Sequence, residues 1–436
     1  NQSLSMTLET FYAHPTLEEQ AALLAPEPAD SPVPVPGPAQ TAPVPTTVPA
    51  APAPAAEPPR RGAPSEPVEV PMLPARTVLL TGATGFLGAH LLRSLLEHGA
   101  QTVVCLLRDP DRARLDAVLT AYFGPDWFSA HWDRIECVTG NITRPRLGLS
   151  VKDYQALAQR IDAVFHAAAD VRHYASDVRS LSTNVVGTSN VADLALAAGA
   201  PLGHVSTLSI CGGHITAAPD RYAIFSETDY DIGQNWQENI YLKGKFLAEG
   251  AVYDRIPLGL AARVFRVGRL VGRASDGTFQ QNPDTNAFFR LLRAVAYLGA
   301  LPVSAASETL DLTPVDFCAD AIVALANTPL PVSHIVHPAQ VTLGQAVRAV
   351  CPTLRLVSPQ EFSSLLGNAL QGEGQSILAP LVDLSAQAGQ ASHITPCAGL
   401  TCETLSELGV SLAPAPPATL LRAFAAQFSS KAGERS

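Results

Sequence analysis

From residue 76 onward, short apolar runs alternate with longer segments in which apolar residues recur every three to four positions. Six runs are predicted as strands: 77–80, 102–107, 134–138, 162–166, 203–207 and 261–266. They are largely apolar rather than strictly alternating, which is typical of strands covered on both faces. Such strands, separated by helices like the one predicted over 86–98, indicate a parallel sheet. We therefore predict an α/β fold built on a doubly wound parallel sheet.

The first 75 residues follow a different pattern. Residues 1–24 contain one short helical stretch with a capping box at Thr16 and Glu19, and are too few to fold alone. Residues 25–75 hold nearly half of the chain's 37 prolines. Because proline fixes φ and removes a backbone donor, we predict a disordered, extended linker. At ~3.1 Å per residue it spans on the order of 100 Å, either as an inert spacer or as a tether between domains.

Composition narrows the classes of function. The 436-residue chain carries a formal net charge of −10, which argues against a nucleic-acid-binding surface. Its seven cysteines are scattered without a CxxC pair, so neither a zinc site nor a disulfide framework is expected, and a cytoplasmic location fits best. No apolar run approaches ~18 residues, so no membrane-spanning helix is predicted. The sequence begins with Asn1, without an initiator methionine or a signal-peptide pattern. We therefore expect that it is a piece of a longer chain.

A glycine-rich turn joins the first predicted strand to the first predicted helix. Gly82 permits the tight turn, Gly85 lets the backbone approach a pyrophosphate, and Gly88 lets the helix lie close to the strand. The amides at the start of the helix attract phosphate. This context predicts a Rossmann-type dinucleotide site, and the alternative is a glycine-rich turn that binds no ligand.

The end of the second predicted strand indicates which dinucleotide binds. An NAD site usually places Asp or Glu there to hold the ribose 2′-hydroxyl. This chain has Arg108, whose guanidinium suits a 2′-phosphate. We therefore predict NADPH rather than NADH, with Arg112 or Arg114 as helpers or as solvated surface arginines.

Tyr241 and Lys245 form a YxxxK pair, which puts a phenol and an ammonium on one face of a helix. A neighbouring cation stabilises a phenolate, so the pair predicts a tyrosine of lowered pKa. The fifth predicted strand ends in hydroxyl residues, 206–209, at the edge of the sheet where cofactors bind. For Ser206 and Ser209 we favour backbone capping. A catalytic hydroxyl at this strand end would share a substrate oxygen with the phenol.

Seven longer stretches together carry a family resemblance. They are LLTGATGFLGAHLL, HAAADVRHYASD, NVVGT, HVSTLSICGG, DIGQNWQENIYLKGKFLAE, FRVGRLVGRASDGTFQ and LDLTPVDFCADAIV. Residues 76–425 resemble the terminal thioester reductase domains of nonribosomal peptide and polyketide synthetases, which belong to the extended short-chain dehydrogenase/reductase superfamily. They are also similar to the reductase domains of carboxylic acid reductases and to fatty acyl reductases. The resemblance implies an oxidoreductase of natural product biosynthesis that uses NADPH to release a carrier-bound thioester as an aldehyde, with further reduction to an alcohol left open.

The resemblance also assigns site residues. It implies a catalytic triad of Thr207, Tyr241 and Lys245. The predicted cofactor contacts are Gly82, Thr84, Gly85, Phe86, Leu87, Gly88, Arg108, Asn141, Ala167, Ala168 and Lys245. Asn141 is a departure, because the superfamily usually has an aspartate beside the adenine.

The same resemblance suggests a domain organisation. Residues 1–24 look like the last helix of a carrier domain, and 25–75 form the linker. Residues 76–274 form the NADP-binding domain. Residues 275–436 form a smaller, mostly helical subdomain for substrate and carrier, from which 311–337 returns to the Rossmann core. The implied partner is an upstream carrier domain that bears a phosphopantetheine thioester; neither nucleic acid nor membrane is expected.

Several alternatives stay open at this stage. His166 is interpreted as structural, and the remaining histidines show no ligand spacing, so no metal is expected. The arginines at 266, 269 and 273 line the cofactor, bind pantetheine phosphate or form structural ion pairs. The rival functions are a sugar epimerase or hydroxysteroid dehydrogenase of the same superfamily, a non-catalytic dinucleotide-binding module, and a carrier-bound Dieckmann-type cyclase.

Overall fold

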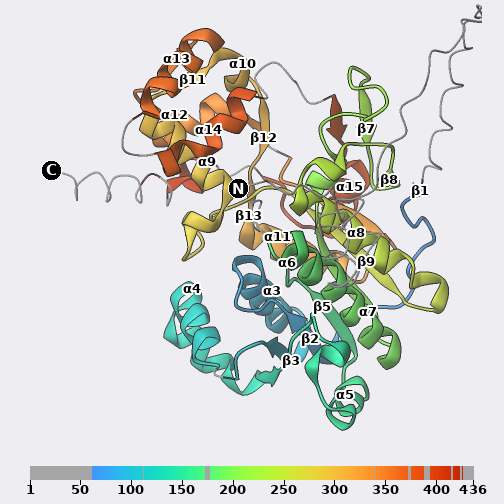
Figure 1. The fold of residues 1–436 in the computed structure, drawn as a ribbon. Coiled ribbons are helices and arrows are strands. Elements are labelled where there is room, and N and C mark those ends of the chain that lie inside the picture. The colour runs from blue at the N-terminus through green and yellow to red at the C-terminus, as the bar shows by residue number, and fades with distance from the viewer. Residues whose placement is uncertain are drawn as a thin grey trace, which may run out of the picture. The chain divides into compact units, whose positions relative to one another are not determined.

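The computed structural model describes residues 61–110, 112–171, 177–338, 340–371, 375–386, 393–413, 416–422 and 425. Everything described lies in one compact unit, Glu57–Ser436 (Figure 1). The predicted carrier remnant at 1–24 and most of the predicted linker lie outside the described residues.

A seven-stranded parallel sheet forms the centre of this unit, in the order β14-β9-β6-β5-β2-β3-β4. This confirms the predicted doubly wound fold. The strands are β2 (Ala75–Thr81), β3 (Ala100–Leu107), β4 (Ile135–Thr139), β5 (Ala163–His166), β6 (Leu202–Thr207), β9 (Ala262–Val267) and β14 (Val332–Ile335). The first six lie where the apolar runs predicted them. The seventh was not predicted as a strand, because its polar centre, Ser333-His334, breaks the apolar run.

Helices cover both faces of the sheet, and each face has its own apolar core. One core includes residues of α3 (Phe86–Glu97), α4 (Ala113–His131) and α11 (Val315–Leu325). The other includes residues of α5 (Val151–Ala158), α7 (Gly187–Ala198) and α8 (Ile240–Tyr253). A short helix, α6 (Asp177–Leu181), and a π-helical turn over Ser182–Val186 precede α7.

A third core belongs to the smaller, mostly helical lobe, drawn in orange in Figure 1. Its helices are α9 (Ala287–Leu298), α10 (Val303–Ala306), α12 (Leu343–Val350), α13 (Pro359–Ala369), α14 (Gln375–Ala386) and α16 (Pro417–Leu420). Two small pairings complete it: parallel β11 (Ala300–Pro302) with β16 (Arg355–Val357), and antiparallel β12 (Thr309–Asp311) with β15 (Gln340–Thr342). The lobe lies within residues 275–436, the range predicted for the substrate subdomain.

The chain after this lobe returns to the main body. Helix α15 (Gly399–Glu407) contacts α11 and β14, and Leu405 lies in the core of the main body. Strand β17 (Ile394–Pro396) pairs with β7 (Ala223–Phe225). Nearby, β10 (Leu270–Val271) pairs with β13 (Thr313–Pro314). The predicted assignment of everything after residue 337 to the substrate subdomain is therefore wrong for 393–408.

The predicted linker boundary at residue 75 is also wrong. Residues 61–74 pack against the main body instead of standing free in solvent. Strand β1 (Arg61–Gly62) pairs with β8 (Asp229–Asp231), and the side chains of Met72 and Leu73 are buried. In the sequence, the surrounding prolines outweighed Met72 and Leu73, the two apolar residues that the fold buries.

Candidate active site

The glycine turn between β2 and α3 has the geometry that a dinucleotide phosphate site requires. Gly82 has φ +82°, and a Cβ there would lie 2.6 Å from the amide nitrogen of Ala168. A Cβ on Gly88 would collide with the carbonyl oxygen of Gly82. Gly85 is exposed at the start of α3, and its amide donates to the Gly82 carbonyl at 2.8 Å. The turn is thus closed tightly and leaves the first amides of α3 at the surface for a phosphate.

Two of the predicted cofactor residues lie directly against this turn. The amide of Ala167 donates to the carbonyl of Thr81 at 3.2 Å, and that of Ala168 donates to the Thr81 hydroxyl at 3.3 Å. Thr84 is partly buried in the turn. The side chains of Phe86 and Leu87 pack into the interior, Phe86 against His90, Tyr122 and Phe279. Their contribution to a cofactor site would therefore come from main-chain amides.

The residues predicted at the adenosine end of the site have different surroundings. Arg108 is exposed immediately after β3, where a ribose phosphate would lie. Arg112 is not a solvated arginine, because it pairs with Asp116 at 3.1 Å and lies over the Trp132 ring. Asn141 closes a turn, since its Oδ1 accepts from the amide and hydroxyl of Thr143. Its structural role does not prevent an adenine contact, but it explains why an Asx-type residue follows β4.

The three predicted catalytic residues meet at the end of β6 and the first turns of α8. The Thr207 hydroxyl is hydrogen-bonded to the Tyr241 phenol. The ammonium of Lys245 donates to the carbonyl oxygen of Val205 at 2.7 Å, two residues before Thr207. Helix α8 begins at this position because the side chain of Asn239 accepts from the amides of Tyr241 and Leu242, at 2.9 and 3.2 Å. Phenol, hydroxyl and ammonium thus gather on one strand end.

The pKa of Tyr241 differs from the sequence-based expectation. Burial raises the pKa of the phenol above its ordinary value, and the hydrogen bond with Thr207 acts in the opposite direction. The expected lowering by a neighbouring cation is therefore wrong for the protein without cofactor. Burial lowers the pKa of Lys245 to about 8, opposed by the negative charge of Glu249. Tyr241 is accordingly protonated at neutral pH and suited to donate a proton.

Ser206, Ser209 and His166 lie near the three predicted catalytic residues. The two serines differ from the prediction, whereas His166 agrees with it. The Ser206 hydroxyl is buried without a protein partner, and Ser209 is exposed, so neither forms the predicted backbone cap. The Thr207 hydroxyl takes that place by accepting from the amide of Ser209 at 3.2 Å. His166 bridges the hydroxyls of Thr81 and Thr188, and burial lowers its pKa to about 3. It is therefore a neutral structural histidine, as the sequence indicated.

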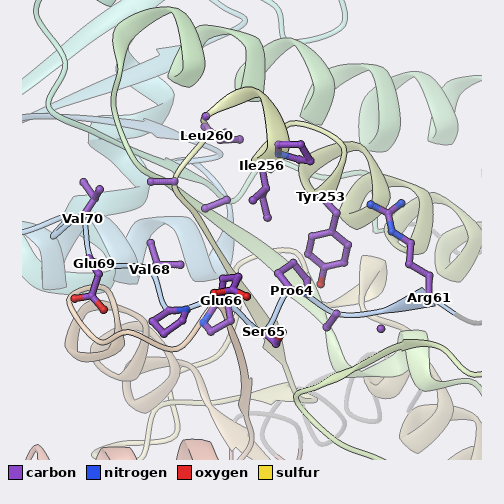
Figure 2. A pocket seen from close by; sticks show the side chains of 18 residues that line it. Arg61, Pro64, Ser65, Glu66, Val68, Glu69, Val70, Tyr253, Ile256 and Leu260 are labelled. Atoms are coloured by element: carbon purple, nitrogen blue, oxygen red, sulfur yellow. The ribbon is translucent and has the colours of Figure 1, made fainter.

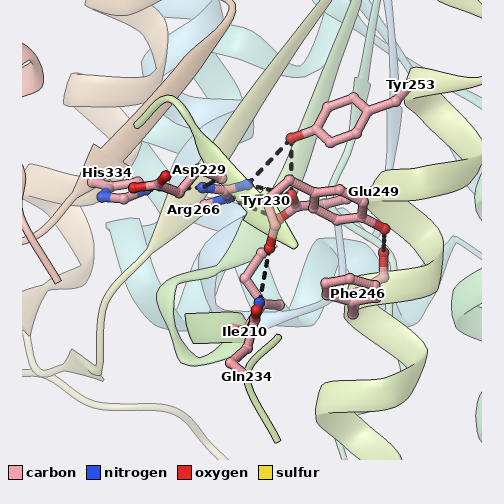
Figure 3. Close-up of polar contacts among 9 residues, drawn as sticks. All are labelled: Ile210, Asp229, Tyr230, Gln234, Phe246, Glu249, Tyr253, Arg266 and His334. Atoms are coloured by element: carbon pink, nitrogen blue, oxygen red, sulfur yellow. Dashed lines mark hydrogen bonds and ion pairs between the residues drawn. The ribbon is translucent and has the colours of Figure 1, made fainter. Parts of the chain in front are cut away.

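A buried ion pair lies behind the catalytic helix (Figure 3). Arg266 on β9 donates through Nη2 to Glu249 Oε2 at 2.9 Å, and Glu249 also accepts from the Tyr253 hydroxyl at 2.9 Å. Arg266 Nη1 donates to the carbonyl of Asp229 at 2.8 Å and to Nε2 of His334 at 3.1 Å, and its Nε donates to the Glu249 carboxylate at 3.2 Å. Burial and the Arg266 charge lower the pKa of His334 to about 3, so its Nε2 is an acceptor. This network connects α8 to β8, β9 and β14.

Two further arginines of this region, which the sequence left unassigned, also have partners within the protein. Arg273 pairs with Asp276 at 2.6 Å and donates to the carbonyl of Tyr122 at 2.9 Å. Arg269 lies over the ring of Phe288. Arg266 and Arg273 therefore form structural ion pairs, one of the alternatives that the sequence left open.

Sequence reasoning missed two residues that position the triad. Asn239 stands two residues before Tyr241, where an N-cap is preferred, so a search for caps would have found it. Glu249 stands one turn beyond Lys245 on the same face of α8, but its partner Arg266 lies on another strand. The spacing alone therefore gives no sign of the ion pair.

Membrane-spanning helices and metal-binding clusters were considered among the residues that the structure describes. No helix there is long and apolar enough to cross a membrane. No group of three His, Cys, Asp or Glu side chains in those ranges could hold a metal ion.

Comparison with known proteins places this site in a family. The family model described as "Male sterility protein", an NAD-binding domain, matches residues 80–322. The chain is 32% identical over 291 residues to one subunit of the linear gramicidin synthase of Brevibacillus parabrevis, covering 65% of this chain and 5% of that protein. It is 30% identical over 287 residues to the L-2-aminoadipate reductase large subunit of Penicillium chrysogenum, covering 60% and 19%. The chain thus spans only a small part of these relatives.

Solved structures agree with the sequence relatives. The terminal R domain of the myxalamid PKS-NRPS pathway is 30% identical with a TM-score of 0.70, covering 82% of this chain and 91% of that one. A thiolation-reductase di-domain of an archaeal non-ribosomal peptide synthetase is 28% identical with a TM-score of 0.72, covering 85% and 77%. The chain therefore belongs to the male sterility family of NAD-binding domains and is a homologue of the terminal reductase domains of nonribosomal peptide synthetases.

Proposed function

We propose that this domain uses NADPH to release a phosphopantetheine-bound acyl or peptidyl thioester from an upstream carrier domain as an aldehyde. The observation that carries the proposal is the convergence of Thr207, Tyr241 and Lys245 at the carboxyl end of β6, on the same edge of the parallel sheet as the glycine turn. The kinship with reductase domains, one of them joined to a thiolation domain, supports the substrate class.

The residues of the crevice fit a bound dinucleotide. The amides at the start of α3 would hold the pyrophosphate, and Arg108 would hold the 2′-phosphate. The ammonium of Lys245, which uses one donor for Val205, would bind the ribose hydroxyls with the others. When bound, the nicotinamide supplies a hydride to the thioester carbonyl carbon.

Thr207 and Tyr241 act on the carbonyl oxygen of the thioester. Their hydroxyls would donate hydrogen bonds to it where negative charge develops, and each donor of this kind contributes roughly 3–4 kcal/mol to the transition state. Tyr241 delivers its proton to that oxygen, which leaves a hemithioacetal. Its collapse breaks the carbon–sulfur bond and gives the aldehyde and the carrier thiol. The protonated phenol found here suits this role.

Acyl-pantetheine thioesters test the proposal without knowledge of the native acyl group. We expect NADPH oxidation in step with formation of aldehyde and free thiol. Interconversion of free sugars or alcohols with no action on thioesters would favour an epimerase or hydroxysteroid dehydrogenase. Thiol release that needs no NADPH would favour cyclisation, and cofactor binding without turnover would favour a non-catalytic module.

A further inference from the structure

Residues 61–74, called the strap below, lie along the edge of the sheet opposite the cofactor crevice. Between strap and main body runs a groove lined by Tyr253, Ile256, Leu260 and the first residues of β9 (Figure 2). The strap is held at three places along its length, and at the second and third the main body binds to its main chain.

The first holding point is at the C-terminal end of α8. Arg61 forms an ion pair with Asp254 at 3.0 Å and lies over the rings of Tyr230 and Tyr253, at 5.8 Å from each centroid. The amide of Ala63 donates to the carbonyl of Thr228 at 2.9 Å. These contacts continue the pairing of β1 with β8 and fix the direction in which the strap begins.

The second holding point is Arg263, whose side chain is only 1% exposed. Its Nη2 and Nη1 donate to the carbonyls of Val68 and Val70, at 2.7 and 3.0 Å. Its Nε donates to the carbonyl of Thr328 at 2.8 Å. Burial of a guanidinium is costly unless its donors are satisfied, and two of these three acceptors belong to the strap. Arg263 and the strap therefore depend on each other.

The third holding point is Asn327. Its Oδ1 accepts from the amides of Met72 and Leu73, at 2.9 and 2.8 Å, and its Nδ2 donates to the carbonyl of Leu73 at 2.5 Å. Met72 and Leu73 are both buried, and the methyl carbon of Met72 lies close to Gly203 of β6. The Asn327 side chain thus binds both amide and carbonyl groups of the strap. Burial of Met72 and Leu73 fixes which strap residues lie opposite it.

These contacts suit an extended peptide. Prolines at 64, 67, 71 and 74 keep the strap from forming a helix, and the paired amides and carbonyls fall between them. We propose that the strap is an integral part of the reductase fold, docked on a peptide-binding edge built by Arg263 and Asn327, and that residues 61–74 therefore add nothing to the length of a tether.

This assignment fixes where the tether leaves the domain. Arg61 lies beside Asp254, which is 13 residues beyond Tyr241 along α8. At 1.5 Å per residue the exit point lies roughly 20 Å along the helix from the catalytic phenol. If the proposed function holds, an upstream carrier is attached near the C-terminal end of α8, and its thioester must reach Tyr241 at the other end of that helix. The docking of the strap itself does not depend on that function.

Hydrogen–deuterium exchange on the full chain tests the docking. We expect protection at the amides of Ala63, Val68, Met72 and Leu73, the four with acceptors in the main body. Asn327→Ala should speed exchange at Met72 and Leu73 by roughly 10- to 100-fold, because the amides of these two buried residues lose their acceptor. Arg263→Lys keeps the positive charge but loses the planar guanidinium that donates to the carbonyls of Val68 and Val70. It should therefore speed exchange at Val68. Glu66→Gln, an exposed position on the strap, is the matched control and should change neither.

Exchange across residues 63–73 at the rate of an unstructured peptide, with the sheet still protected, would overturn the proposal. Unchanged protection in both Asn327→Ala and Arg263→Lys would also overturn it. In the same samples, reduction of a soluble acyl-pantetheine thioester should be unaffected by either variant. Failure of the wild-type protein to reduce any thioester would contradict the proposed function and leave the exchange result intact.

Discussion

Glu249 and Arg266 form an ion pair in which neither side chain has any exposed surface, with Oε2 and Nη2 at 2.9 Å. Glu249 lies one helical turn beyond Lys245, and its negative charge favours the protonated form of that lysine. The pair therefore links the placement and charge of Lys245, a proposed catalytic residue, to the core of the domain.

Removal of one partner of this ion pair should be strongly destabilising. Glu249→Ala leaves the Arg266 guanidinium buried and uncompensated, at an expected cost of about 3–5 kcal/mol in the free energy of unfolding. Glu136→Ala removes the exposed ion pair with Arg160 and should cost less than about 1 kcal/mol. Urea unfolding of both variants measures these free energies. Equal losses of stability would show that the buried ion pair contributes no more than the exposed one.

The closed glycine turn makes a prediction about cofactor binding. A Cβ at position 88 meets the carbonyl oxygen of Gly82, so Gly88→Ala should push α3 away from the turn and abolish dinucleotide binding. Gly367→Ala is the control, because nothing lies near a Cβ there and alanine favours the helix. Calorimetric titration with NADPH separates the two. Wild-type affinity in Gly88→Ala would show that the turn is not the phosphate site.

Arg108 should determine the preference for the phosphorylated cofactor. Arg108→Glu should weaken NADPH relative to NADH by roughly 10- to 100-fold, the value of one or two charge-assisted hydrogen bonds. Arg221→Ala removes an exposed arginine outside the predicted cofactor site and should leave the ratio unchanged. Dissociation constants for both cofactors provide the measurement. An unaltered ratio in Arg108→Glu would place the selecting residue elsewhere.

Lys245 predicts a pH dependence. Its pKa is lowered to about 8, so the ammonium that would hold the ribose and support Tyr241 is present below that pH and lost above it. The value of kcat/KM for a thioester should therefore fall as pH rises through about 8. Lys245→Arg stays charged throughout this range and, although slower, should lack that falling limb. The same limb in Lys245→Arg would assign it to another group.

The sequence predicted the sheet well, and it predicted that Thr207, Tyr241 and Lys245 lie near one another, for a physical reason. Six apolar strands and the YxxxK helix are local patterns, and a parallel sheet brings their ends to one edge. Strand β14 escaped because its Ser333 and His334 are buried by partners from distant segments, Thr401 and Cys397 among them. The strap and the Glu249–Arg266 pair escaped for the same reason. Each is stabilised by contacts between residues that no local period relates.

The pKa of Tyr241 shows a second limit of sequence reasoning. The i, i+4 spacing predicted a phenol acidified by Lys245, whereas burial dominates and raises its pKa. Spacing states which groups are neighbours but not how far water is excluded from them.

Turnover of an acyl-pantetheine thioester by Tyr241→Phe tests the central claim most directly. Tyr222→Phe, at a tyrosine that is 76% exposed, is the matched control. The account predicts that Tyr241→Phe keeps NADPH affinity but loses roughly 10²- to 10⁴-fold in kcat for aldehyde formation, the usual value of a positioned proton donor. Tyr222→Phe should match the wild type. Undiminished aldehyde formation by Tyr241→Phe would show that the Tyr241 phenol is not the proton donor.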